Sequence, residues 1–216
     1  GGTESVRYFI SGNYNRQEGM VKFTDYTSYA ARANVEVTAV KNLKFGINIA
    51  PTYSINNDPG VEGKDNILHQ AVSFTPVQED SMGLYPNVGL NGQYRWSVSP
   101  SSPYGKLEYT IGETKRFRTL STVYADYSII PGLNLRTTVN LDNADITSKG
   151  YNPYIIASSL PTRLAQQSQL TSGSYNTIRK RTFVNENTLS YNKVFNSVHD
   201  VSFVGGFTYN SDKIEN

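Results

Sequence analysis

The sequence is poorest in the residues that support thiol, redox and metal chemistry. None of its 216 residues is a cysteine, which excludes disulfides, zinc–thiolate sites and thiol nucleophiles. Only two are histidines, and without cysteine beside them a zinc site is not expected. Charged residues amount to 18% and the formal net charge is +2, so the balance does not suggest a nucleic-acid partner. We therefore expect no metal, no cofactor and no nucleic acid.

Long apolar runs are also missing. No stretch approaches the roughly 18 consecutive apolar residues that a membrane-spanning helix requires, which by hydropathy alone favours a soluble protein. Strands of a membrane β-barrel escape this test, because they alternate lipid-facing and lumen-facing residues and keep a low mean hydropathy. The chain opens at Gly1-Gly2-Thr3 without an initiator Met or a signal peptide, although an outer-membrane protein must be exported. We interpret it as an internal fragment.

The residues that are plentiful favour strands and turns: the chain has 16 tyrosines and 17 glycines, with heavy use of Asn, Ser and Thr. Between Tyr29 and Ile55, apolar side chains occupy almost every odd position, which predicts two long strands. A three-residue loop, Val40-Lys41-Asn42, joins them, with Asn in the left-handed position. The predicted facing pairs are Ala39 with Leu43, Val37 with Phe45, Val35 with Ile47, Ala33 with Ile49, and Tyr29 with Tyr53. The two tyrosines indicate part of an aromatic girdle.

A second hairpin is predicted between Thr119 and Leu141, around Ile130-Pro131-Gly132. Gly132 suits a left-handed position, but Ile130 precedes proline and is steered away from the helical region, so we expect a wider turn. Weaker alternation adds strands near residues 6–14, 182–191 and 201–210, which makes about seven strands. Their connections alternate between short turns and long segments, the longest from 56 to 115 and from 143 to 181. This is the pattern of periplasmic turns and extracellular loops in outer-membrane barrels.

Strand length decides between a barrel and the competing interpretation, a soluble β-sandwich with one wet face. Leu43 to Ile55 would span about 43 Å at roughly 3.3 Å per residue, whereas soluble strands average about 5 to 6 residues. A tilted membrane strand needs about 9 to 11 residues. The sequence therefore favours an all-β, antiparallel transmembrane barrel sector. Pro51 lacks a backbone donor, so we expect local distortion near the outer rim.

Several motifs resemble barrel segments of SusC-like (SusC/RagA) TonB-dependent outer-membrane transporters of Bacteroidota. The motifs, in chain order, are Arg7-Tyr8-Phe9-Ile10-Ser11-Gly12 with Tyr14 and Gln17-Glu18-Gly19; Ala125-Asp126-Tyr127 with Pro131-Gly132-Leu133; and Glu186-Asn187-Thr188-Leu189-Ser190-Tyr191 with Phe195, His199-Asp200 and Gly206-Phe207. The similarity spans nearly the whole chain. One departure is Ser102-Pro103-Tyr104, where an Asn-Pro pair is expected.

The resemblance implies that residues 1–216 form part of a barrel of about 22 strands whose plug and remaining strands lie elsewhere. It also implies import of glycans or peptides through the bacterial outer membrane, with a SusD-like lipoprotein and a TonB complex as partners. The alternatives are a small outer-membrane barrel and a soluble adhesin-like or binding module. About seven strands cannot close such a barrel, so this chain by itself should transport nothing.

The candidate substrate contacts are aromatic and basic residues in the longest loop. They are Tyr85, Tyr94, Arg95, Trp96 and Tyr104. Aromatic faces stack on the apolar surfaces of sugars and side chains, and long outer loops are where a transporter meets its cargo. The same rings would also serve to pack the loop against itself, and we prefer this interpretation.

Two basic clusters precede strands that descend from the long-loop side. They provide the candidate lipopolysaccharide contacts Lys115, Arg116, Arg118, Arg179, Lys180 and Arg181, since guanidinium and ammonium groups pair with phosphate. A plain solvated charge run is an equally good interpretation.

No catalytic constellation is evident. His199 and Asp200 are adjacent and would point to opposite faces of a strand, and His69 has no recognisable partner in the sequence. We therefore predict that the protein is not an enzyme.

Overall fold

The computed structural model describes residues 1–60, 67–73, 103–153, 171–196 and 198–216 of the chain. Its elements are β1 (Val6–Glu18), β2 (Asp25–Val40), β3 (Leu43–Asn57), α1 (Ile67–Ser73), α2 (Pro103–Tyr109), β4 (Ile111–Ile130), β5 (Leu133–Asn152), β6 (Ser172–Phe195) and β7 (His199–Glu215). The predicted all-β class is confirmed. Tyr85, Tyr94, Arg95 and Trp96 lie outside the described residues.

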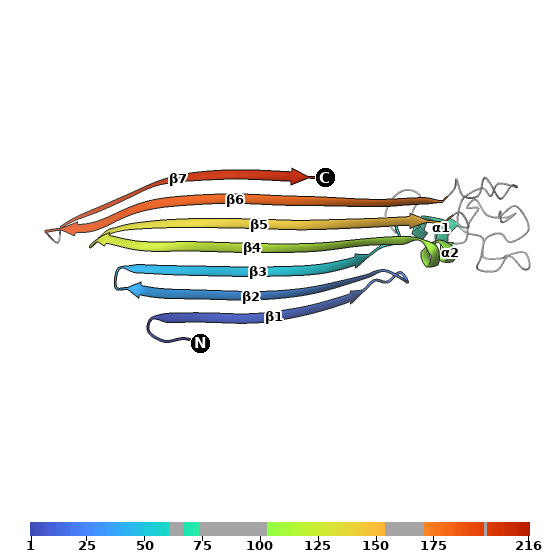
Figure 1. Cartoon of the computed structure of the whole chain (residues 1–216), viewed down its shortest axis with the longest axis horizontal. Coiled ribbons are helices and arrows are strands. Elements are labelled where there is room, and N and C mark those ends of the chain that lie inside the picture. The colour runs from blue at the N-terminus through green and yellow to red at the C-terminus, as the bar shows by residue number, and fades with distance from the viewer. Residues whose placement is uncertain (61–66, 74–102, 154–170, 197) are drawn as a thin grey trace, which may run out of the picture.

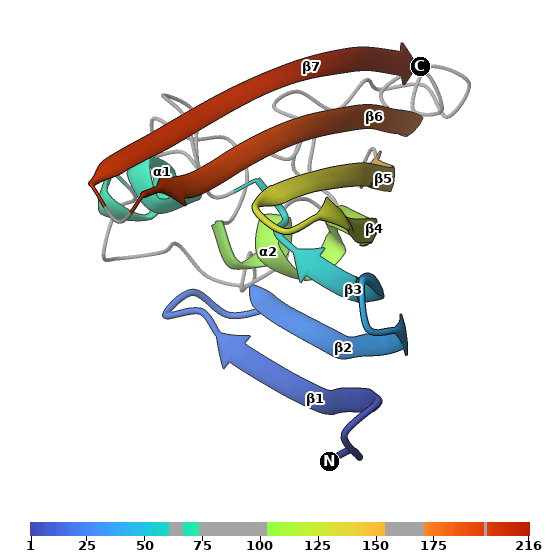
Figure 2. The ribbon, with the colours of Figure 1, turned by 90° about the vertical axis from the view of Figure 1, so that its left-hand side faces the viewer.

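The seven strands form one antiparallel sheet in simple chain order, β1-β2-β3-β4-β5-β6-β7 (Figure 1). Short turns after β2, β4 and β6 lie at one end, while the helices lie at the other end, as the alternating connection lengths predicted. Seen from the end, the strands follow a curved surface with β1 and β7 as its two edges (Figure 2). Among the described residues no second sheet covers this one, which speaks against the β-sandwich.

The register of the first hairpin is almost as predicted. Four of the five predicted pairs are found: Val37 with Phe45, Val35 with Ile47, Ala33 with Ile49, and Tyr29 with Tyr53. The fifth is wrong, because Leu43 pairs with Val40 after a register shift between Thr38 and Val40. A bulge absorbs the odd residue, so the turn itself is Lys41-Asn42. Asn42 is not among the residues with positive φ, contrary to expectation.

The second hairpin repeats this construction. Ile130 pairs with Leu133 after a shift between Ser128 and Ile130, so the turn is narrower than predicted. A residue before proline favours extended conformations, and Ile130 therefore continues the strand instead of widening the loop. Gly132 has φ 91°, the left-handed conformation expected of it.

Pro51 disturbs only one of its two neighbouring ladders. The β2–β3 pairs run from Ala30 with Thr52 to Ala33 with Ile49 without a register change, and the intervening positions are unpaired. On the other side, Pro51 pairs with Thr119 in an unbroken β3–β4 ladder. The predicted distortion is therefore confirmed as a local gap.

The strands are longer than apolar alternation indicated. β5 continues to Asn152 and β6 begins at Ser172, although the segment from 143 to 181 was expected to be mostly loop. Backbone pairing continues there while the side chains become polar and charged. Alternating apolar residues are confined to the part of each strand that needs an apolar environment. The hydrogen-bonded strands continue beyond that part.

The sheet has almost no conventional core. Ile67 and Ala144 are the buried apolar residues in the described part of the chain, whereas Ile10, Phe203 and Phe207 are more than half exposed. Water is a poor environment for so many contiguous apolar side chains. None of the helices in the described ranges is long and apolar enough to span a membrane.

Candidate functional site

Strand alternation divides the sheet into an outer, apolar face and an inner, polar face. Direct pairing carries the outer face across all strands, so odd positions on β2 to β7 share it with even positions on β1. The switch of parity arises because Val6 pairs with Val37. The two faces must therefore be treated as separate surfaces with separate partners.

We call the apolar band on the outer face the apolar belt. It comprises the outward residues from Val6 to Tyr14 on β1, Tyr29 to Ala39 on β2, Leu43 to Ile55 on β3, Phe117 to Ile129 on β4, Leu133 to Leu141 on β5, Phe183 to Tyr191 on β6 and Val201 to Tyr209 on β7. On β1, β5, β6 and β7 the belt is about nine residues wide, close to the 9–11 residues with which a tilted strand crosses hydrocarbon.

The upper edge of the apolar belt follows one hydrogen-bonded row on β1, β2 and β4 and departs from it on β5, β6 and β7. Tyr14, the last belt residue of β1, lies in a row of paired residues that reaches Glu215 on β7. On β7, however, the belt already ends at Tyr209, about six residues earlier. The upper edge lies in this row at Tyr29 and Phe117, four residues below it at Leu141 on β5 and Phe183 on β6, and six residues below it at Tyr209.

The lower edge shifts more evenly. Measured from the row of Val6, it lies two residues away on β2 and β3, four on β4, β5 and β6, and six on β7, where it ends at Val201. Six strand steps thus shift the lower edge by about one residue each, or about 3.3 Å along the strand for every 4.8 Å across, a slope of about 35° that is similar to the tilt of strands in outer-membrane barrels. The lower edge therefore lies at nearly constant height in a sheet tilted by this angle, whereas the upper edge is stepped and on β3 extends to Ile55.

A polar group interrupts the apolar belt between β5 and β6. The Thr137 hydroxyl donates to Asn187 Oδ1 at 2.6 Å, and Asn187 Nδ2 donates to Asn185 Oδ1 at 2.6 Å. Asn185 Nδ2 in turn donates to the backbone oxygen of Thr138 at 3.2 Å. The chain of hydrogen bonds satisfies these groups internally, which an apolar environment demands.

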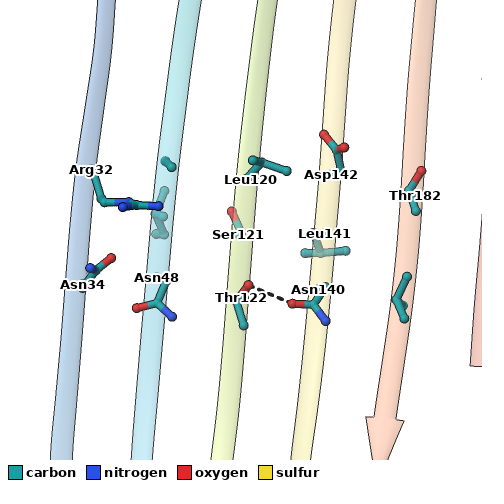
Figure 3. A pocket seen from close by; sticks show the side chains of 13 residues that line it. Arg32, Asn34, Asn48, Leu120, Ser121, Thr122, Asn140, Leu141, Asp142 and Thr182 are labelled. Atoms are coloured by element: carbon teal, nitrogen blue, oxygen red, sulfur yellow. Dashed lines mark hydrogen bonds between the residues drawn. The ribbon is translucent and has the colours of Figure 1, made fainter. Parts of the chain in front are cut away.

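The inner face carries a groove of about 450 Å³ across β2 to β6, lined by both polar and apolar residues (Figure 3). Its inner-face lining consists of Arg32, Asn34, Asn48, Thr122, Asn140, Asp142 and Thr182, together with Ala50, Leu120 and Val184. The Thr122 hydroxyl donates to Asn140 Oδ1 at 2.8 Å. Beside the groove, Arg118 donates to both oxygens of Asp142, from Nε at 2.8 Å and from Nη2 at 2.6 Å. The hydrogen-bonded polar groups of this face suit contact with water.

A cluster of charged and aromatic groups lies on the inner face toward the short-turn end. The Tyr124 hydroxyl donates to Glu36 Oε2 at 2.9 Å, and the Arg136 guanidinium lies 4.7 Å from the centre of the Tyr124 ring. Arg136 also approaches Asp126, with Nη1 3.7 Å from Oδ2. These contacts tie β2, β4 and β5 together across the inner face.

Beyond the apolar belt, at the helix end of the strands, the outer face becomes charged. We call this surface the charged collar; it contains Arg16, Glu18, Asp25, Glu113, Lys115, Asp145, Lys149, Arg179, Arg181, Lys213 and Glu215. Short ion pairs include Lys115 Nζ–Glu113 Oε2 at 2.9 Å, Arg179 Nε–Asp145 Oδ1 at 2.8 Å and Lys213 Nζ–Glu215 Oε1 at 2.7 Å.

Hydrogen bonds favour the ionised forms of the charged collar. The bond from Lys213 holds the pKa of Glu215 below its usual value, and the bond to Glu113 raises the pKa of Lys115. Lys213 and Glu215 are exposed, so their pair contributes little to stability and exchanges readily for another counter-ion, whereas the Glu113 side chain is only 23% exposed.

The structure separates the six basic candidates predicted from the sequence. Lys115, Arg179 and Arg181 belong to the charged collar, whereas Arg116, Arg118 and Lys180 lie on the inner face by strand alternation. Sequence reasoning missed Lys149 and Lys213. The signal that would have found them is their odd position on strands whose odd positions carry the belt.

Tyr104, on α2, is the one predicted substrate contact that is described. Its ring lies 6.3 Å from that of Phe23, edge to face, and Lys22 Nζ lies 5.3 Å from its centre. These contacts join α2 to the β1–β2 connection and favour a packing role for this ring. In the described ranges, no group of three or more His, Cys, Asp or Glu side chains is arranged to hold a metal ion.

Comparison with known proteins points to one class. No family model matches the sequence. Over 225 residues it is 26% identical to TonB-dependent receptor P3 of Formosa agariphila, covering 100% of this chain and 21% of the relative. TonB-dependent receptor P26 of the same organism is 28% identical over 211 residues, covering 97% and 20%. The chain thus spans about a fifth of the length of the curated relatives it matches.

Solved structures agree on the fold. A chain of the RagAB peptide transporter matches with a TM-score of 0.71 at 14% identity, covering 99% of this chain and 24% of that one. The RagAB peptide importer in its open-open state matches with a TM-score of 0.75 at 16% identity, covering 99% and 23%. Together with the curated relatives, these matches confirm the resemblance to SusC-like TonB-dependent receptors that the sequence motifs predicted.

Proposed function

We propose that this chain, a sector of a SusC-like TonB-dependent receptor, forms part of the wall of a nutrient transporter in the bacterial outer membrane. The apolar belt would face lipid, the inner face would line the lumen, and the helix end would lie outside the cell. The observation that carries the proposal is the even slope of the lower edge of the apolar belt. A flat slab of hydrocarbon sets a boundary at constant height across tilted strands, whereas a soluble core has no reason to do so.

The cargo and partners are proposed from the resemblance. We propose import of an oligosaccharide or peptide, together with a SusD-like surface lipoprotein and a TonB complex that acts on other parts of the whole protein. The similarity to chains of the RagAB peptide importer supports this assignment and favours peptide cargo. Residues 1–216 would belong to one barrel domain. A non-catalytic role follows, with Tyr85, Tyr94, Arg95 and Trp96 as proposed contacts in the outer vestibule.

A labelling experiment on neighbouring residues tests the proposed orientation. The chain contains no cysteine, so single cysteines can be introduced into it at chosen positions. Val123 belongs to the apolar belt and Thr122 to the inner groove, one residue apart on β4. In outer membranes of cells making the full-length protein, Thr122→Cys should react with a water-soluble maleimide, and Val123→Cys should be protected until detergent is added.

Equal reactivity of the two cysteines in intact membranes would contradict a lipid-facing belt. Recovery of the full-length protein in the soluble fraction would contradict outer-membrane localisation altogether. Competition by peptides or oligosaccharides for uptake in the same cells then identifies the cargo class.

A further inference from the structure

Two cations of the charged collar face each other directly. Arg181 on β6 pairs with Lys213 on β7, and both side chains point outward. Directly opposed residues on one face have Cβ atoms about 4.5–5.5 Å apart, and like charges at such positions repel. The arrangement does not serve the stability of the sheet.

The neighbouring carboxylates do not cancel this charge. Asp145 pairs with Arg179 at 2.8 Å, and Glu215 pairs with Lys213 at 2.7 Å and lies 4.0 Å from Arg179. Within the described ranges, no carboxylate lies within ion-pair distance of Arg181, whose partner on β5 is Asn143. The three cations Arg179, Arg181 and Lys213 are therefore accompanied by two carboxylates. The group has a net charge of +1.

An aromatic pair lies below the two cations, with Ser211 between Tyr209 and Lys213 on β7. Phe183 and Tyr209 end the apolar belt on β6 and β7, and their ring centres are 6.2 Å apart. Arg181 is the next outward residue after Phe183. Positive charge thus lies just above apolar side chains. This arrangement suits a lipid whose headgroup carries phosphate and whose acyl chains lie below it.

We propose that Arg181 and Lys213, above the Phe183–Tyr209 pair, bind a phosphate group of a lipopolysaccharide molecule in the outer leaflet. The planar guanidinium of Arg181 suits two phosphate oxygens, and the ammonium of Lys213 can exchange its exposed bond to Glu215 for one to phosphate. Arg179 adds charge from the next outward position of β6. The site rests on the proposed function, since it requires the apolar belt to face the outer membrane.

The test compares two double variants of the full-length protein that remove equal charge. Arg181→Gln with Lys213→Gln neutralises the site. Arg116→Gln with Lys180→Gln neutralises two cations of the inner face that are sequence neighbours of collar residues. Each protein is placed in lipid nanodiscs, and binding of lipid A carrying two phosphates is compared with binding of its dephosphorylated form. We expect the first variant to bind phosphorylated lipid A about tenfold or more weakly, because each cation near an anionic surface contributes about a factor of five.

The inner-face variant should bind like the wild-type protein, and dephosphorylated lipid A should not distinguish the three proteins. Equal binding by the two variants would overturn the site while leaving the transporter proposal intact, provided that the wild-type protein fractionates with the outer membrane. If it does not, the proposed function itself is wrong. Thermal unfolding of both variants in detergent separates lost binding from lost folding.

Discussion

Gly46 shows how one residue without a side chain organises the inner face. The Tyr124 ring lies over it, and a Cβ built on Gly46 would fall on the ring atoms. Because the ring can approach the backbone this closely, its hydroxyl reaches Glu36 on β2, two strands away. The sequence shows Gly46 only as one of several glycines in strands, and its role becomes visible when β3 and β4 are paired.

Gly46→Ala should therefore displace Tyr124 and break its bond to Glu36. We expect a loss of about 1–3 kcal/mol in stability, the usual range for overpacking, seen as a lower unfolding temperature in detergent. Gly12→Ala is the matched control, because a Cβ there meets only the backbone oxygen of Ala30 at an ordinary 4.0 Å. Equal melting of the two variants would show that the ring moves aside without cost.

The aromatic residues of the longest loop differ in the role we expect of them. The Tyr104 ring contacts Phe23 and Lys22, so we no longer expect it to bind cargo. Tyr94 and Trp96, which lie outside the described residues, retain the sequence-based prediction of cargo contact.

Trp96→Ala in the full-length transporter should weaken cargo affinity several-fold, since an aromatic stacking contact contributes about 0.5–1.5 kcal/mol beyond its buried area. Equilibrium binding of the imported peptide or oligosaccharide measures the effect. Tyr104→Ala is the comparison, and it should lower thermal stability more than affinity. Unchanged affinity in Trp96→Ala would remove this residue from the vestibule.

The turns of the β2–β3 and β4–β5 hairpins fix the register of the strands that they join. Each predicted three-residue turn is a two-residue turn in the structure. The third residue belongs to the preceding strand, where a bulge accommodates it. In the second hairpin, Gly132 has φ 91° and its backbone oxygen accepts a hydrogen bond of 2.8 Å from Asn192 of β6. The turn is thereby attached to a third strand.

Gly132→Ala should be costly for two reasons, a left-handed backbone and a Cβ that would fall on the Asn192 backbone oxygen. Gly60→Ala measures the effect of the left-handed backbone by itself, because Gly60 has the same φ of 91° but no atom within 4 Å of a Cβ. We expect Gly60→Ala to lose about 1 kcal/mol and Gly132→Ala clearly more, in thermal unfolding of the full-length protein. Similar losses would mean that the contact with Asn192 relaxes freely.

For the whole molecule, the apolar belt replaces the core that a soluble domain of this size would have. Val123 illustrates this position: it is 46% exposed and pairs directly with Ile47 and Val139, both belt residues. Its environment must come from outside the sheet.

Val123→Arg should therefore cost about 2–4 kcal/mol, as expected for a charge at mid-membrane on a lipid-facing position. Thr122→Arg, one residue away on the inner face, should cost less than about 1.5 kcal/mol, mostly from its lost hydrogen bond to Asn140. The measurement is the yield of folded protein in the outer membrane, with unfolding in denaturant as the quantitative check. A larger loss from Thr122→Arg would reverse the assignment of the faces.

Alternation and turn length in the sequence are enough to assign which side chains share a face and, within each hairpin, nearly all of the residues that meet. Period-two alternation fixes the face of every residue on a strand, and a short turn leaves almost no freedom in register, which is why Val35 opposite Ile47 could be predicted. The family resemblance rested on local motifs of the same kind.

The alignment of strands joined by long segments is visible in the folded structure alone. The pairing of β3 with β4 sets Tyr53 against Phe117, and that of β5 with β6 sets Asp145 against Arg179. Alternation does not specify such offsets, because a shift of two residues preserves every face. The slope of the lower edge of the apolar belt and the ion pair between Asp145 and Arg179 depend on this alignment, because each relates strands whose register no short turn fixes.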